Sequence, residues 1–236
     1  MAGFSTSGTT GSITITDTSN TAQITTVGSI TASGAFTINA ADTIQIAASA
    51  PITAASISFT APNLFIGHGT TIQTTSGDMN FLGNGTGNSL SVVLNNSGTS
   101  STTTTLQAAG NINFNSSGTT GPITISATGN GGILTTAGSI NLYGGSGAVS
   151  VTATSLTGTV NGTGTTFVVT TPSGTALALG TITASTSATL SAGTNITMTS
   201  GNFINSPTIS LTSTAGSIEP LVVQSLLKMA LPVLWP

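Results

Sequence analysis

The amino-acid sequence predicts an all-β protein: a parallel β-helix, or β-solenoid, of about ten coils followed by an apolar C-terminal segment. Three observations lead to this prediction: short strands in which apolar and polar residues alternate, an internal sequence similarity, and a near absence of charged residues. They assign residues 1–217 to the solenoid body and residues 218–236 to a segment of different composition.

Short alternating runs recur along the body, separated by Gly, Asn and Ser. The clearest is Gly-Ser-Ile-Thr-Ile-Thr at 11–16, and similar runs lie at 34–39, 56–60, 111–115, 122–126, 148–152, 195–199 and 208–212. This alternation places the apolar side chains on one face of a strand and Thr, Ser or Asn on the other. Thr and Ile are β-branched and favour strands. Such short strands at a spacing of roughly 6–12 residues suit an all-β sandwich, barrel or solenoid.

The internal similarity supports a stacked architecture. Residues 4–30 and 114–140 are identical at sixteen of twenty-seven positions, at an offset of 110. With a shift of three residues the similarity continues, so that 4–41 resembles 114–154. If each coil holds about 20–22 residues, this offset equals about five coils. Outward Thr and Asn would then stack on their counterparts in neighbouring coils and share side-chain hydrogen bonds.

The chain holds only five charged residues: Asp17, Asp42, Asp78, Glu219 and Lys228. A nucleic-acid partner needs a basic patch that releases counterions, and one lysine cannot form it. A transmembrane helix needs about 20 continuous apolar residues, and polar residues interrupt every apolar run of the body. Nucleic acid and membrane are therefore not expected as partners.

The sequence predicts no catalytic, cofactor or metal site, so the expected protein is not an enzyme. His68 stands between two glycines and is interpreted as a surface residue in a turn. The three aspartates are interpreted as turn residues that hydrogen-bond their own backbone. A Ser-His-Asp triad drawn from these residues has no specificity in a chain so rich in Ser and Thr.

The C-terminal segment holds the chain's only Glu, Lys and Trp. Pro220 and Pro232 would bound a helix over about 220–231. Three roles are open: a cap over the end of the same solenoid, a strand or plug given to a neighbouring subunit, and a membrane anchor. The candidate assembly residues are Pro220, Leu221, Val222, Val223, Leu226, Leu227, Leu231, Val233, Leu234 and Trp235.

The pattern Gly-x-Ile-x-Ile/Leu/Phe-x at 11–16, 110–115 and 138–143 resembles the filamentous-haemagglutinin-like β-strand-repeat proteins of bacterial surfaces. The resemblance covers about residues 8–217 and carries over no functional residue. It implies a right-handed parallel β-helix, export to the cell surface, and a role in adhesion or in building fibres.

We expect a structural subunit of an extracellular or cell-surface filament. Its partner would be further copies of the same chain, joined head to tail through the solenoid ends and the C-terminal segment. The alternative is an adhesin or ice-binding module that acts through outward Thr, Ser or Asn ladders, such as Thr14/Thr16 or Thr197/Thr199. A glycan or surface contact is part of that alternative.

Overall fold

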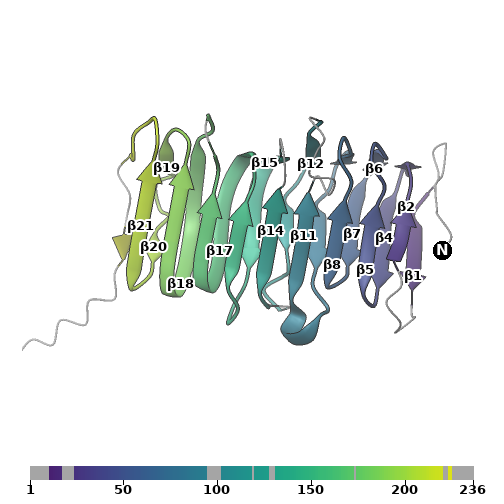
Figure 1. Ribbon diagram of the computed structural model, residues 1–236, viewed down its shortest axis with the longest axis horizontal. Helices are drawn as coiled ribbons and strands as arrows, with labels where there is room; N and C mark the ends of the chain where they lie inside the picture. Colours follow the sequence, from purple (N-terminus) through teal and green to yellow (C-terminus); the bar gives the residue numbers. More distant parts are fainter. Residues whose placement is uncertain are drawn as a thin grey trace, which may run out of the picture.

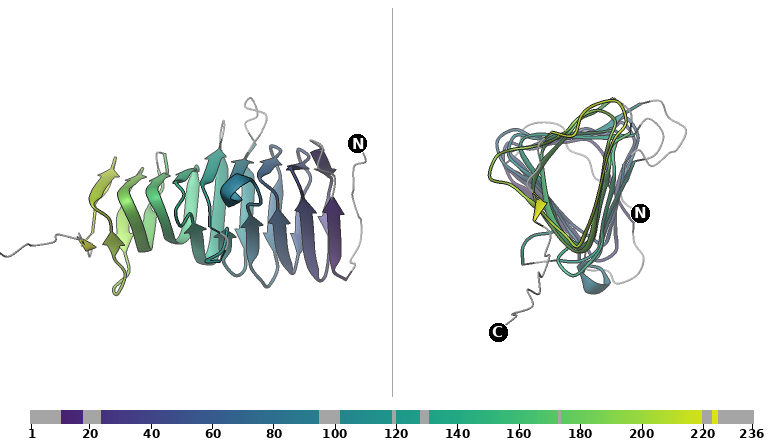
Figure 2. Two further views of the ribbon diagram at one scale, coloured as in Figure 1. Left: turned by 90° about the horizontal axis from the view of Figure 1, so that it is seen from below. Right: turned by 90° about the vertical axis from the view of Figure 1, so that its left-hand side faces the viewer.

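The computed structural model describes residues 11–17, 24–94, 102–118, 120–127, 131–172, 174–219 and 223–224. These residues form a β-solenoid, as predicted, with parallel strands stacked along one long axis (Figure 1). Viewed along that axis, the coil has a triangular outline with three faces (Figure 2). About eight complete turns are stacked, and further strands continue the stack at the C-terminal end.

Each face is one parallel ladder, in which the inner strands pair with strands of the preceding and following turns and the end strands pair on one side only. The first face holds β1 (Ile13–Asp17), β4 (Ala35–Ala40), β7 (Ser56–Thr60), β10 (Met79–Leu82), β13 (Ile112–Phe114), β20 (Ile204–Asn205) and β22 (Val223–Gln224). The second holds β2 (Ile24–Val27), β5 (Thr43–Ile46), β8 (Asn63–Ile66), β11 (Leu90–Leu94), β14 (Ile123–Ala127), β16 (Val149–Thr152) and β21 (Thr208–Ser213). The third holds β3 (Ile30–Thr31), β6 (Ile52–Ala54), β9 (Thr71–Thr74), β12 (Thr104–Ala108) and β19 (Ile196–Met198).

Three long strands bend around the corners, and each forms part of more than one face. The strand β15 (Gly132–Tyr143) runs along the third and first faces, while β17 (Ser155–Thr170) and β18 (Leu177–Ala192) run along all three. A short 3-10 helix, η1 (Thr86–Asn88), lies at the corner between β10 and β11. The described residues contain no α-helix.

The predicted alternation is confirmed in the burial of side chains. Along β4 and β7, inward apolar residues are buried and the residues between them are partly exposed. On the first face, Phe59, Phe81 and Phe114 are in register in the core, and Phe36, which pairs with Ile57, extends this phenylalanine column diagonally; each has at most 1% of its surface exposed. Successive ring centroids lie 5.9, 5.8 and 4.9 Å apart. Such spacing is typical of favourable aromatic contacts, so this column ties four turns together.

The internal similarity does not follow the turns in the way the sequence predicts. Ile13 and Ile15 lie on the first face in β1, whereas their counterparts Ile123 and Ile125 lie on the second face in β14. The offset therefore spans four turns and one further face, and the expectation of five coils is wrong. The cause is uneven coil length: Met79 pairs with Ile112 in the next turn, whereas Phe36 pairs with Ile57.

Parallel pairing continues past residue 217, into the segment that the sequence predicts to be a cap or a subunit-exchange segment. Ile218 forms a parallel bridge with Ile196, and the Glu219 N–H donates to the Ile196 carbonyl at 3.0 Å. Val223 and Gln224 form β22 beside β20. The predicted helix over 220–231 is wrong at these two residues, because the edge of β20 offers them a parallel partner. The rest of that segment lies outside the described residues.

Close stacking at the corners leaves no room for a side chain at some of the glycines. A Cβ at Gly67 would lie 2.4 Å from the Ala48 nitrogen in the preceding turn, whereas a Cβ at Gly11 would meet nothing within 4 Å. We therefore expect Gly67→Ala to lower the free energy of unfolding by about 1–3 kcal/mol, as overpacking does. Gly11→Ala, the matched control, should change it by less than about 0.5 kcal/mol. Urea denaturation followed by circular dichroism measures both, and equal losses would contradict the stacking argument.

Candidate functional site

Four asparagines occupy one outward column of the first face, in four successive layers. They are Asn80 of β10, Asn113 of β13, Asn141 of β15 and Asn161 of β17, in direct register. The Nδ2 atoms of the last three donate to the Oδ1 of the preceding layer, at 2.8, 2.7 and 3.1 Å. The separation of neighbouring strands, about 4.8 Å, allows such amide stacking. We call this column the asparagine ladder.

The ladder leaves part of its hydrogen-bonding capacity open. A side-chain amide has two N–H donors and two lone pairs, and stacking uses one of each. At the far end, Asn161 Oδ1 accepts the backbone N–H of Thr181 at 2.9 Å. At the near end, Asn80 Nδ2 makes no hydrogen bond to any described residue. All four asparagines are partly exposed, so the remaining donors and acceptors can reach a ligand.

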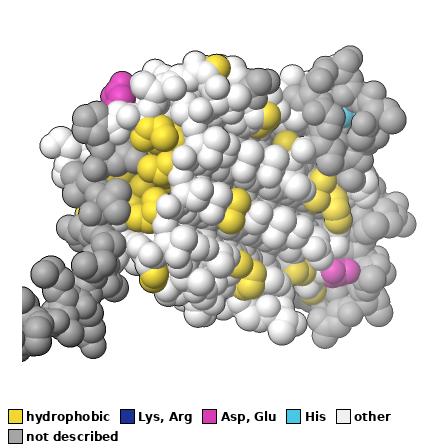
Figure 3. All heavy atoms as spheres, turned by 60° about the vertical axis from the view of Figure 1, so that its left-hand side comes forward, with side chains coloured by type: hydrophobic (Ala, Val, Ile, Leu, Met, Phe, Trp, Pro, Cys, Tyr) yellow, Lys and Arg dark blue, Asp and Glu magenta, His cyan; other side chains and the backbone are white. Residues whose placement is uncertain are grey.

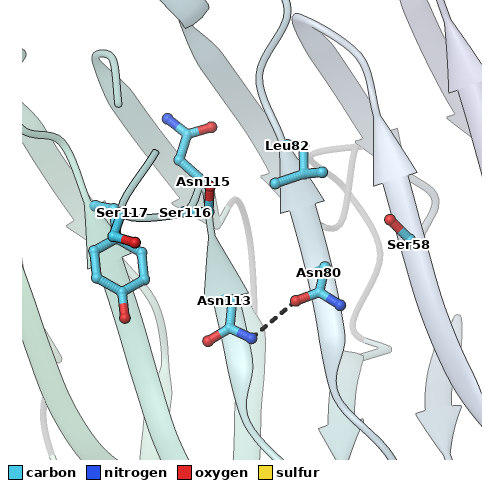
Figure 4. Close-up of a pocket in the computed structure, with 8 residues that line it drawn as sticks. Ser58, Asn80, Leu82, Asn113, Asn115, Ser116 and Ser117 are labelled. Carbon is cyan, nitrogen blue, oxygen red and sulfur yellow. Dashed lines mark hydrogen bonds between the residues drawn. The ribbon is translucent and has the colours of Figure 1, made fainter. Parts of the chain in front are cut away.

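A groove of about 370 Å³ lies over the near end of the ladder (Figure 4). Asn80 and Asn113 lie side by side in it, on β10 and β13, with Ser58 beyond them on β7. The complete lining is Ser58, Asn80, Leu82, Asn113, Asn115, Ser116, Ser117 and Tyr143. None of these side chains carries a charge, and they combine amides, hydroxyls, one aliphatic group and one phenol.

The turn after β13 forms one side of the groove, and Asn115 fixes its shape. Asn115 has a φ of 59° and a fully buried side chain. Asparagine tolerates this left-handed conformation better than most residues. Its N–H donates to the Phe81 carbonyl at 2.7 Å, and its Oδ1 accepts the Gly83 N–H at 2.8 Å. The turn is thus held to the preceding coil, and Ser116 and Ser117 keep a defined position.

A second polar column lies at the corner between the third and first faces. Asp78 Oδ1 accepts the backbone N–H of Asn111 at 2.7 Å, and Asn111 Oδ1 accepts that of Ser139 at 2.9 Å. Asp78 Oδ2 also lies 3.4 Å from Asn113 Nδ2, beside the groove. The interpretation of Asp78 as a residue that bonds its own backbone is therefore wrong, since its carboxylate joins two turns.

The remaining candidates for chemistry lie at separate corners. His68 lies in the turn between β8 and β9, as predicted, and is partly buried there. Asp17 ends β1 and Asp42 lies between β4 and β5, both at the corner between the first and second faces. The fold therefore does not bring His68 and an aspartate together at one corner. Within the described part of the chain, no group of three or more metal-binding side chains occurs.

The two ends of the solenoid are the candidate assembly surfaces. At the C-terminal end, Met198, Ile209 and Leu211 are only partly buried against the core, and Ile218 is 44% exposed. Hydrophobic side chains gather at this end in Figure 3. At the other end, Ile13 and Ile15 are likewise only partly buried. Of the ten candidate assembly residues, only Val223 lies within the described residues, in β22.

Of the two predicted ladders, the one at Thr14 is found: its outward column passes through Thr37 and Ser58 and continues into Asn80, the first member of the asparagine ladder. Thr197 instead pairs with Ala178. Two further rows of hydroxyls lie on the second face, where the sequence analysis named no ladder. One row holds Ser91, Thr124, Ser150, Thr189 and Ser210, interrupted by Val168, and the other, the longest uninterrupted row, holds Ser126, Thr152, Thr170, Ser191 and Thr212.

No protein-family model, curated protein or solved structure matches this chain. The resemblance to filamentous-haemagglutinin-like proteins therefore stays a prediction. Among the described residues, no helix has the length and apolar character needed to cross a membrane.

Proposed function

We propose that the protein is a structural subunit of an extracellular or cell-surface filament that polymerises head to tail. The observation that supports this proposal best is that, within the described part of the chain, the same three parallel ladders end in unpaired edges at both ends of the stack. Among the described strands, β1 pairs only with β4, and β21 pairs only with β18. Each end therefore offers an edge that could accept a further parallel strand.

The direction of the strands favours head-to-tail stacking. A second copy translated along the axis presents its β2 below β21 with the same strand direction, so the parallel ladder continues. Two like ends facing each other would instead bring strands together in opposite directions. A head-to-tail contact is heterologous, and because translation along an axis does not close a ring, it generates a filament.

The chemistry of the two ends is compatible with this contact. Ile209 and Leu211 at one end, and Ile13 and Ile15 at the other, are inward residues that lack a complete apolar layer beside them. Burial of a side chain of this size contributes about 1.5–3 kcal/mol. The described charges near the ends, Asp17 and Glu219, belong to different corners, so stacking need not bring these like charges together.

Deletion of residues 219–236 tests the contribution of the C-terminal segment. We expect the truncated protein to stay monomeric in negative-stain microscopy and sedimentation, because the deletion removes β22 and the apolar residues that follow it. Its β content in circular dichroism should persist, since β1–β21 remain. Filaments that persist unchanged after this deletion would contradict the proposed junction.

A further inference from the structure

We infer that the groove beside the asparagine ladder binds a neutral saccharide. This binding site is separate from the filament junction, because it lies on the first face over β7, β10 and β13, in the middle of the stack. The inference rests on the polarity of the lining, its lack of charge, and its rigidity.

The lining matches the hydrogen-bonding needs of a sugar. A sugar hydroxyl both donates and accepts, and a side-chain amide offers a donor and an acceptor side by side. Asn80 presents an unused Nδ2, and the hydroxyls of Ser58 and Ser117 make no hydrogen bond to described residues. Tyr143 adds a phenol with the same open capacity, and its ring, together with Leu82, can cover the apolar C–H face of a sugar ring.

The charges nearby favour a neutral ligand over an acidic one. All eight lining residues are uncharged, and the nearest acidic group, Asp78, lies within 3.4 Å of the Asn113 amide. A carboxylate or sulfate on the ligand would be repelled by this aspartate, without any lysine or arginine in the lining to offset it. The groove volume of about 370 Å³ lies within the range of small-molecule sites.

The site is held in shape before any ligand arrives. The ladder amides fix one another across four turns, and buried Asn115 ties the turn of Ser116 and Ser117 to Gly83. A rigid site loses little conformational freedom on binding, which favours affinity. Beyond the groove the ladder continues through Asn141 and Asn161 along the axis. An oligosaccharide laid along it would meet further amides, so affinity should rise with chain length.

The test is titration calorimetry with the full chain and four probes: cellohexaose, maltohexaose, hexa-N-acetylchitohexaose and hexagalacturonate. At least one neutral hexamer should bind, and more tightly than its dimer, while the acidic hexamer should bind at least tenfold more weakly. Ser117→Trp fills the groove and Tyr143→Ala removes the ring, so each should weaken binding about tenfold or more. Ser150→Trp, at an exposed position of the second face, is the matched control and should leave affinity unchanged.

Three results would overturn the inference: no binding of any neutral hexamer, stronger binding of the acidic one, or equal affinity of the groove variants and the control. Repeating the titration with Ile209→Lys, a variant designed to block the filament end, separates this inference from the proposed function. If the sugar still binds to that variant, the binding site lies in the groove, whatever the state of assembly. If binding is lost together with the polymer, the binding site lies at the filament junction instead.

Discussion

Replacing Phe81 with alanine is expected to lower the free energy of unfolding by about 3–5 kcal/mol. Phe81 is fully buried, and its ring lies 5.8 Å from that of Phe59 and 4.9 Å from that of Phe114. The truncation removes its hydrophobic burial and leaves a cavity in the middle of the phenylalanine column. Because each turn of a solenoid is supported mainly by its neighbours, a defect here separates the turns on either side.

Phe65→Ala is the matched control, since it deletes the same side chain from an outward position of β8. Phe65 is only partly buried, on the solvent side of the second face. Its removal should change stability by less than about 1 kcal/mol. Urea denaturation of both variants, followed by circular dichroism, measures the difference. Equal losses would mean that the column contributes no more than a surface phenylalanine does.

The inward and outward sides of most strands could be predicted from the sequence, because period-two alternation is a local property. In Ile57-Ser58-Phe59, for example, the two apolar residues are buried and the serine between them is not. The stacking of turns could not be predicted, because it depends on the length of every corner. Asn80 stacks on Asn113, thirty-three residues later, whereas Asn141 stacks on Asn161 after twenty. A prediction that assumes one fixed coil length therefore assigns the wrong residues to each later turn.

The stacking of outward asparagines was predicted in general, but not which four would meet, although a signal for them exists in the sequence. Each of the first three members of the asparagine ladder stands between two apolar residues, as in Met79-Asn80-Phe81 and Ile112-Asn113-Phe114. This context predicts an outward asparagine on a strand, but not that the strands are neighbours. The groove also depends on the left-handed turn at Asn115, which joins residues distant in sequence. The helix predicted across Val223 and Gln224 is wrong for a related reason, since pairing with β20 overrides local preference.

Ile209→Lys and Ile15→Lys are each expected to block one end of the subunit and thereby to prevent polymerisation. In the free subunit, either lysine lies at an open end and can extend its ammonium group into water. At a filament junction the same charge would be buried without a partner, which is strongly unfavourable. Ile209→Lys and Ile15→Lys should each be monomeric in sedimentation, with unchanged β content. Ser210→Lys, whose side chain points outward from the same strand as Ile209, is the control and should still form filaments.

Mixing the two blocked variants distinguishes the two possible kinds of contact. In head-to-tail assembly, the intact C-terminal end of Ile15→Lys meets the intact N-terminal end of Ile209→Lys, and the resulting pair is blocked at both outer ends. The mixture should therefore give heterodimers and no longer species, with a mass that sedimentation resolves. In an assembly through like ends, each variant alone would already dimerise through its unblocked end, and mixing would add nothing. Dimers of either variant alone would thus contradict the heterologous junction, because only a contact between unlike ends requires both variants at once.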